Sequence, residues 1–162
     1  MNKLITSLAA PASGEPPRIG RRLIGLLYDF FPLLGLWFVT VVAFLALHYF
    51  RLSSSAGEAY AMAHASIEPN SLESLLLFLA LLGITGLYFT ASWRRGGQTI
   101  GMKPFRTYVL APDGSFASWR SLWIRFFVGL LALPVGFALA YVRADKLTLH
   151  DWLSNTRFVY RQ

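Results

Sequence analysis

The sequence predicts an all-α polytopic membrane protein. Its 162 residues are 55% hydrophobic and only 14% charged, which is too apolar for an ordinary soluble domain. Three apolar segments, residues 23–47, 72–93 and 122–142, each reach the roughly 20 residues that a helix needs to cross a hydrocarbon core of ~30 Å. Because these segments occupy most of the chain, we expect no separate soluble catalytic domain.

The first 21 residues are predicted to form a flexible cytoplasmic lead. They include Pro11, Gly14, Pro16 and Pro17. The apolar stretch that follows is too long for a cleavable signal peptide, and no small-residue cleavage site follows it. The membrane domain is therefore expected to cover residues 22–162.

The first apolar segment contains a single charged residue, Asp29. An ionised carboxylate in hydrocarbon costs about 2.5–3.5 kcal/mol on insertion scales, so its presence needs a reason. Arg22 and Gly25 share its helix face, and Pro32, one turn further on, is expected to kink the helix. This pattern predicts a packed or hydrated polar site, in which the cation beside Asp29 could be Arg22 or Arg125 from the third segment.

The basic residues indicate a topology. Lysine and arginine are concentrated in residues 1–22 and 94–121, whereas residues 51–71 carry one arginine against two glutamates. The positive-inside rule therefore places the N-terminus and the second loop in the cytoplasm. Basic residues at that membrane face attract anionic lipid headgroups, by about 1 kcal/mol each. We expect no nucleic-acid partner despite the net charge of +7, because no surface of interleaved aromatic and basic residues is evident.

The first two segments are predicted to be full transmembrane helices, whereas two arrangements of the third segment remain open from the sequence. A full crossing would place the basic tail outside, against the charge rule. Alternatively, Pro134 and Gly136 could divide the segment into two re-entrant half-helices, which return the tail to the cytoplasm. Residues 107–110 and 158–160 have strand-like composition, and Asp113-Gly114 is a turn signal. A short β pair between these strands would favour the return.

Other chemistry is not expected. The chain has no cysteine and its three histidines are dispersed, so neither thiolate chemistry nor a metal site is predicted. No nucleophile stands beside a base, which argues against an enzyme, and no cofactor is expected. Residues 96–101 resemble a phosphate loop only superficially, because Met102 stands where the lysine is required. We interpret them as a solvated turn.

Several motifs resemble those of the RDD family of small bacterial integral membrane proteins. Residues 22–29 (RLIGLLYD) are similar to its opening, in which an arginine begins the first helix and an aspartate lies within it. Residues 97–103 (GQTIGMK) are similar to its second-loop signature, G-x-T-[IL]-G-[KM]. The second aspartate of the family lies in an L-H-D…T segment, here residues 149–151 and Thr156; residues 154–155 (SN) replace the more frequent Ala-Gly. The predicted site comprises the signature residues Arg22, Asp29 and Asp151 and the supporting residues Gly25, Pro32, Gly97, Thr99, Gly101, Arg125 and Thr156.

The resemblance implies a protein of the bacterial cytoplasmic, or inner, membrane. Some relatives have been proposed to exchange monovalent cations for protons, so our first hypothesis is such an exchange, with Asp29 as the titrating carboxylate. Asp151 would then be a gate or an anchor. The second hypothesis is a non-transporting scaffold or accessory subunit, in which Arg22, Asp29 and Asp151 fix helix packing. In that case Asp151 would cap a short helix by accepting from the N–H of Leu153 or Ser154. The partner could be a second copy of the chain or another membrane protein.

Overall fold

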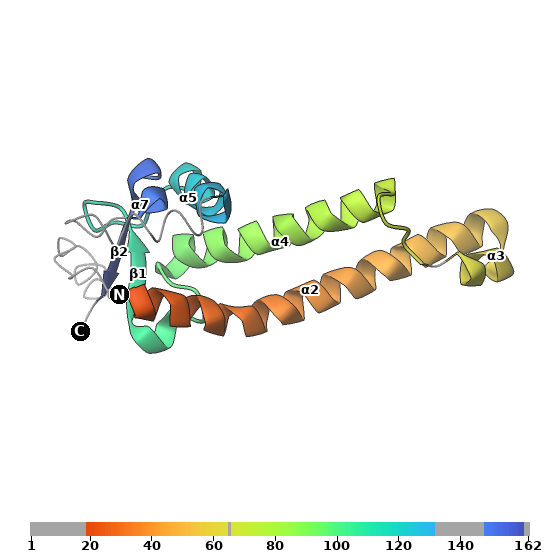
Figure 1. Cartoon of the computed structure of the whole chain (residues 1–162), viewed down its shortest axis with the longest axis horizontal. Helices are drawn as coiled ribbons and strands as arrows, with labels where there is room; N and C mark the ends of the chain where they lie inside the picture. Colours follow the sequence, from red (N-terminus) through yellow and green to blue (C-terminus); the bar gives the residue numbers. More distant parts are fainter. Residues whose placement is uncertain (1–18, 65, 132–147, 161–162) are drawn as a thin grey trace. The chain divides into compact units, whose positions relative to one another are not determined.

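The computed structural model describes residues 19–64, 66–131 and 148–160, most of which are helical (Figure 1). The chain divides into two compact units, one of Met1–Phe31 with Gly86–Gln162 and the other of Pro32–Thr85. The elements in chain order are α2 (Ile19–Ala56), α3 (Glu58–Ala63), α4 (Leu72–Gly96), the 3-10 helix η1 (Lys103–Phe105), β1 (Thr107–Leu110), α5 (Trp119–Leu131), α7 (Leu149–Leu153) and β2 (Arg157–Tyr160).

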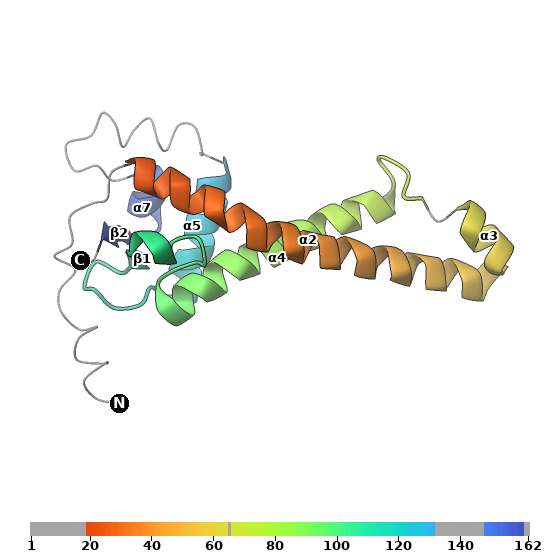
Figure 2. The same ribbon diagram turned by 90° about the horizontal axis from the view of Figure 1, so that it is seen from below.

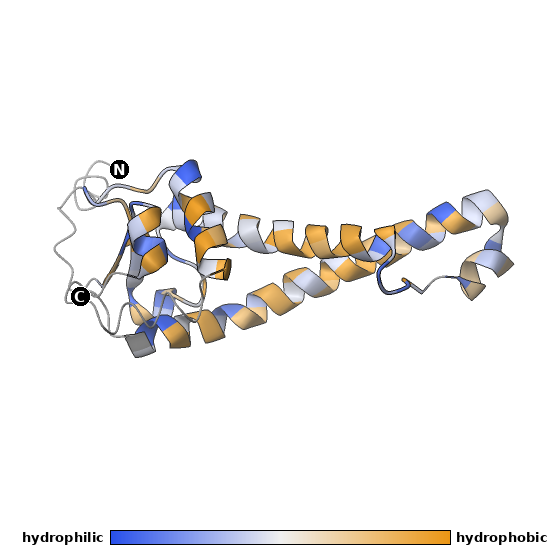
Figure 3. Cartoon of the chain, turned by 45° about the horizontal axis from the view of Figure 1, so that its top comes forward, coloured by the Kyte–Doolittle hydropathy of each residue, from blue (hydrophilic) through white to orange (hydrophobic). Residues whose placement is uncertain are grey.

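Helices α2 and α4 are long and apolar enough to cross a membrane. Within an apolar stretch of 18 residues in α2, only 6% of the residues are buried within the chain; in the corresponding stretch of α4 the share is 17%. A helix of this composition in a soluble protein would bury its apolar side chains in a core. Here Leu27, Phe38 and Phe78 are instead exposed, and Figure 3 shows hydrophobic residues along both helices. Such surfaces call for a hydrocarbon environment.

Both helices are longer than their apolar segments, because helix ends are set by breakers rather than by hydropathy. Helix α2 continues past residue 47 to Ala56, and the next residue, Gly57, has a φ of 90°. Helix α4 ends before Gly97, whose φ is 69° and whose N–H donates to the carbonyl of Trp93 (2.9 Å). A glycine in this left-handed conformation is a common helix terminator. The connection between the two predicted spans, residues 51–71, therefore contains the end of α2 and all of α3.

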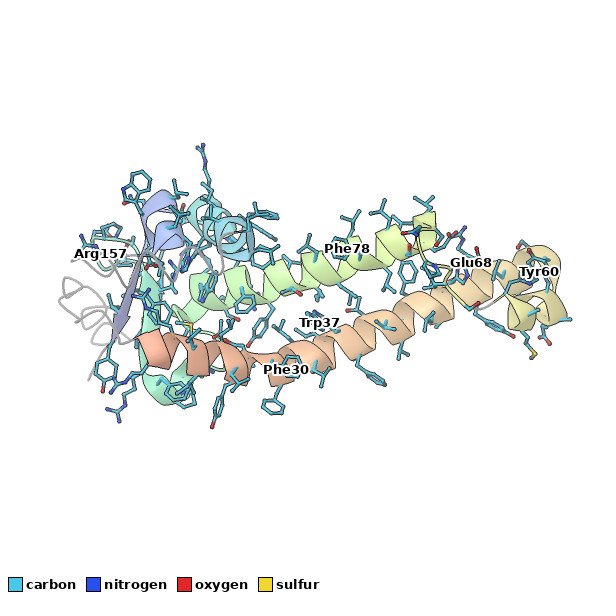
Figure 4. All side chains as sticks on the ribbon, viewed as in Figure 1. Phe30, Trp37, Tyr60, Glu68, Phe78 and Arg157 are labelled. Atoms are coloured by element: carbon cyan, nitrogen blue, oxygen red, sulfur yellow. The ribbon has the colours of Figure 1, made fainter. Side chains whose placement is uncertain are left out.

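Helix α2 passes through Pro32 without a break, and the division between the two units falls between Phe31 and Pro32. Within the unit Pro32–Thr85, Trp37 Nε1 donates to Thr85 Oγ1 (2.8 Å), which joins α2 to α4. Figure 4 shows Trp37 on the face of α2 toward α4. A buried indole N–H needs such a partner in an apolar environment.

The other unit contains a two-stranded antiparallel sheet, in which β1 pairs with β2 and Thr107 is opposite Tyr160. The structure thus contains a strand pair at the two segments whose composition suggested strands. The turn at Asp113-Gly114 is also present, with a φ of 84° at Gly114. The pairing holds the loop after α4 against the C-terminal residues.

The described part of the third apolar segment is α5, which begins three residues before the predicted start. It buries Leu122, Arg125 and Phe126, whose spacing of three and four residues places them on one helix face. The remainder of the predicted segment, including Pro134 and Gly136, lies outside the described residues. So do residues 1–18 of the predicted lead, and α2 begins at Ile19.

Candidate functional site

The buried face of the first turns of α2 is polar. Arg22, Gly25 and Asp29 are buried there, whereas the apolar residues between them are exposed. The spacing of three and four residues makes these positions one stripe. The first turns of α2 therefore present Arg22 and Asp29 to the protein and their apolar side chains outward, the reverse of a soluble amphipathic helix.

Asp29 is 2% exposed and accepts three hydrogen bonds. Tyr88 Oη and the backbone N–H of Gly101 donate to Oδ1 (2.6 and 2.8 Å), and Thr99 Oγ1 donates to Oδ2 (2.5 Å). These donors come from α4 and from the loop that follows it. All three are neutral groups, and neither ion pair found among the described residues includes Asp29.

The loop after α4 lies directly against α2 at Gly101. A Cβ built on Gly101 would fall 2.6 Å from the backbone nitrogen of Asp29 and 2.8 Å from its Cγ, and closer still to the carbonyl oxygen of Gly25. No real side chain tolerates such distances. Gly25 has a related role, because a Cβ there would lie 3.6 Å from the carbonyl oxygen of Gly101. The two glycines allow the backbone of the loop to reach the carboxylate.

The interpretation of residues 96–101 as a solvated turn was wrong. Thr99 is 1% exposed, and the backbone of Gly97 accepts from Val109 N–H in β1 (2.7 Å). Gln98 Nε2 donates to the carbonyl of Thr107 in the same strand (3.0 Å). Buried backbone groups require partners of this kind, and β1 and Asp29 supply them here.

Asp151 has a different environment, in which its charge is balanced by arginines. It is 1% exposed, and Arg125 Nη1 donates to Oδ1 (2.5 Å) while Arg22 Nη1 donates to Oδ2 (3.0 Å). Thr148 donates to Oδ2 from both its N–H (3.1 Å) and its hydroxyl (2.6 Å). One carboxylate thus joins α2, α5 and the start of α7.

Two predictions about these aspartates were wrong. Arg22 and Arg125 both pair with Asp151 and not with Asp29; Arg22 lies about 10.5 Å from Asp29 along the helix, which is two turns. Asp151 does not accept from Leu153 or Ser154. It is the third residue of α7 and forms a capping box with Thr148, the N-cap residue, so its side chain points back toward the helix start.

Thr156 and Phe158 complete the surroundings of the two arginines. Arg125 Nη1 also donates to Thr156 Oγ1 (2.7 Å). The guanidinium carbons of Arg22 and Arg125 lie 4.8 and 5.9 Å from the centroid of the Phe158 ring. Two buried guanidiniums share one carboxylate in this cluster, and the ring face offsets part of the excess positive charge through cation–π attraction.

The ionisation of Asp151 fits a fixed ion pair. Burial favours a higher pKa for this carboxyl, but the neighbouring Arg125 and Arg22 outweigh it and hold the pKa of Asp151 below its ordinary range. Asp151 therefore stays ionised at physiological pH, and its contribution to stability is lost only in strong acid. This behaviour suits an anchor.

His150 should make the protein less stable in mild acid. Burial, with Arg125 acting in the same direction, lowers the pKa of His150 to about 3 from 6.5. Between these values the unfolded chain binds a proton that the folded chain does not. Stability should therefore fall as the pH drops below 6.5, by up to about 1.4 kcal/mol per pH unit. His150→Gln should reduce this loss, as measured by detergent-to-SDS unfolding between pH 7 and pH 5. The same substitution at the exposed His64 is the control and should leave the loss unchanged.

Two site residues were missed from the sequence, Tyr88 and Thr148. Thr148 carried a signal, because a threonine followed three residues later by an acid is the capping-box spacing. Tyr88 carried none, since its partner Asp29 is 59 residues away and helical periodicity does not report contacts between helices.

Two apolar helices of spanning length, with buried carboxylates held by the loop after α4 and by the C-terminal segment, are typical of a membrane protein. The chain matches the RDD family over residues 16–155, and it belongs to that family. The resemblance shown by its motifs is thereby confirmed. No curated protein and no solved structure matches the chain.

Proposed function

We propose that the protein exchanges a monovalent cation for a proton across the membrane, and that Asp29 is the carboxylate that carries them in turn. The observation behind this proposal is the set of neutral donors around Asp29. Burying an ionised carboxylate without a cationic partner is costly, and a bound proton or cation removes that cost. Asp151 differs, because two arginines already neutralise its charge. Asp29 can therefore exchange its bound cation or proton, whereas Asp151 is a fixed ion pair.

The groups around Asp29 suit both occupants. The hydroxyl oxygens of Thr99 and Tyr88 donate to the carboxylate, but each also has lone pairs. When these hydroxyls rotate, their oxygens join the carboxylate as ligands for a hard cation, which prefers oxygen. When Asp29 is protonated, it becomes a donor to one of them. The same three side chains can thus serve the two states of an exchanger.

The proposal includes a location and an assembly. The positive-inside rule places the loop after α4 in the cytoplasm of a bacterium, and Asp29 contacts that loop through Gly101. The exchange site therefore belongs to the cytoplasmic end of the pathway across the inner membrane. Two long apolar helices are few for alternating access, because transporters normally combine repeats around a central site. We therefore include in the proposal an oligomer of this chain.

A second candidate function is a non-transporting scaffold or accessory subunit that holds another membrane protein. It is favoured by the tight contact of Gly101 with α2 and by the buried cluster of Asp151 with two arginines. Both features fix the positions of helices and require no movement. In this role Asp29 would serve only to fasten the loop to α2.

Asp29→Asn should fold normally and lose exchange. The asparagine oxygen can still accept from Tyr88 and Gly101, and its amide N–H can donate to Thr99 Oγ1 after that hydroxyl rotates. The charge is removed while the hydrogen bonds remain. The measurement is collapse of a pH gradient in proteoliposomes with a trapped pH dye, after addition of Na⁺, K⁺ or Li⁺. Wild-type protein should dissipate the gradient, and Asp29→Asn should match empty liposomes.

The control is Asp29→Leu, which also removes the hydrogen bonds and should destabilise the loop as well. Retained flux in well-folded Asp29→Asn would contradict the assignment of Asp29. If folded, inserted wild-type protein carries no flux with any of the three cations, the scaffold is the better account, and only Asp29→Leu should then weaken recovery of a partner.

A further inference from the structure

Helix α5 has one face buried in the protein and an opposite face that is exposed and mainly apolar. The exposed face carries Arg120 near its start and then Ile124, Phe127 and Leu131, at intervals of four, three and four residues. The last of these is 83% exposed. Such spacing places these four residues on a single helix face. Of the four, only Arg120 is charged, and the rest of the face is apolar.

Helix α5 crosses α4 at an angle, so the two helices touch only over a short stretch. The rings of Phe89 and Phe126 lie 6.3 Å apart, and the guanidinium of Arg125 lies 5.5 Å from the Trp93 ring. Gly86 lies against the same Phe126 ring. One turn of α5 thus meets about two turns of α4. Figure 1 shows α5 nearly end-on while α4 lies in the plane, and the view turned by 90° in Figure 2 shows α5 running across the end of α4.

The segments linked to α5 keep it at the end of α4 where the loop begins. Arg125 pairs with Asp151, which also pairs with Arg22 near the start of α2. The β1–β2 pairing holds residues 157–160 against the loop after α4.

We propose that α5 lies along the membrane interface, with Ile124, Phe127 and Leu131 among lipid acyl chains and Arg120 at the phosphates of anionic headgroups. The depth agrees with this placement. If the basic end of α4, Arg94 and Arg95, marks the headgroups, Phe89 lies about 7.5 Å deeper. Interfacial helices bury their apolar faces by about 5–10 Å.

Lipid is the occupant that the surroundings of α5 favour. Helix α4, against which α5 packs through Phe89 and Phe126, itself exposes apolar side chains such as Leu87, which already require hydrocarbon. Trp119 at its start and Trp152 in the adjoining α7 are exposed, and tryptophan prefers the membrane interface. The inference does not depend on cation exchange. It assigns the described residues of the third segment to the surface of one leaflet.

Nitroxide depth measurements on single cysteines test the placement, and the chain has no cysteine of its own. The variants are Ile124→Cys, Phe127→Cys and Leu131→Cys on α5, with Leu79→Cys and Leu87→Cys on the exposed face of α4 as matched controls. Each labelled protein is reconstituted into phosphatidylcholine–phosphatidylglycerol vesicles, and power saturation is measured with oxygen and with a water-soluble nickel chelate. The three α5 labels should lie at similar, shallow depths, while the two α4 labels should differ by about 12 Å.

Other depth profiles would overturn the proposal. A depth that changes by about 10 Å between positions 124 and 131 would show that α5 runs along the membrane normal as part of a span. Labels that are immobilised and shielded from both reagents would show that protein covers this face. If that shielding weakened as the protein was diluted in lipid, the covering protein would be a second copy of the chain. Circular dichroism and gel filtration of each variant confirm that it is folded.

Discussion

Asp151→Asn should lower the free energy of unfolding by about 3–5 kcal/mol, the usual cost of leaving a buried charge without its partner. The substitution removes the carboxylate that pairs with both Arg22 and Arg125, whose side chains are about as buried as the carboxylate. Two guanidiniums would then face each other with little water to screen them. The measurement is unfolding by SDS in mixed micelles at neutral pH, followed by tryptophan fluorescence.

A second substitution separates this electrostatic effect from a general packing defect. Arg125→Met removes one guanidinium and leaves the pair of Arg22 with Asp151 intact, so alone it should cost less than Asp151→Asn. Combined with Asp151→Asn, it should restore part of the lost stability, because only one unpaired cation remains. If the double variant instead loses as much free energy of unfolding as the two single variants together, charge balance does not explain the importance of Asp151.

The elements of the fold that local pattern determines could be predicted from the sequence. Apolar runs of spanning length located α2 and α4, and β-branched and aromatic residues located the two strands of the sheet. Their ends were less accurate, because hydropathy marks the part of a helix that lipid covers. The ends are set by Gly57 and Gly97, which both have positive φ.

The charged residues of the candidate site could be found from the sequence, but their partners could not. Arg22 and Asp29 share a helix face, and this suggested a common cluster. In the structure they belong to two separate hydrogen-bond networks, because Tyr88 and the loop reach Asp29 while Asp151 reaches Arg22. These contacts join residues 59 to 129 positions apart, which no helical period reports.

One departure from the family pattern has a simple structural account. Asn155 stands where the family more often has glycine, and its φ is 49°. Asparagine is among the residues that adopt this left-handed conformation most readily. The turn between α7 and β2 is therefore kept, and Thr156 N–H donates to the carbonyl of Asp151 (3.0 Å).

Gly101→Ala should destabilise the protein by at least about 2–3 kcal/mol and detach the loop from α2. The added methyl group would meet the backbone of Gly25 and Asp29. Backbone atoms within a helix cannot move aside as the end of a flexible side chain can. The loop should therefore shift, and Asp29 should lose its donors Gly101 and Thr99. Amide hydrogen exchange of residues 97–103 should become faster, and the midpoint of unfolding in SDS should fall.

Gly83→Ala is the matched control, because it is the same substitution within α4 at a position where a Cβ meets nothing within 4 Å. In a helix interior, replacing glycine by alanine is favourable by about 0.5–1 kcal/mol, so this variant should be unchanged or slightly stabilised. Equal stability of the two variants would mean that the loop does not rest on α2 through Gly101. In that case Asp29 would also lack its backbone donor, and both proposed roles of the carboxylate would lose the contact on which they depend.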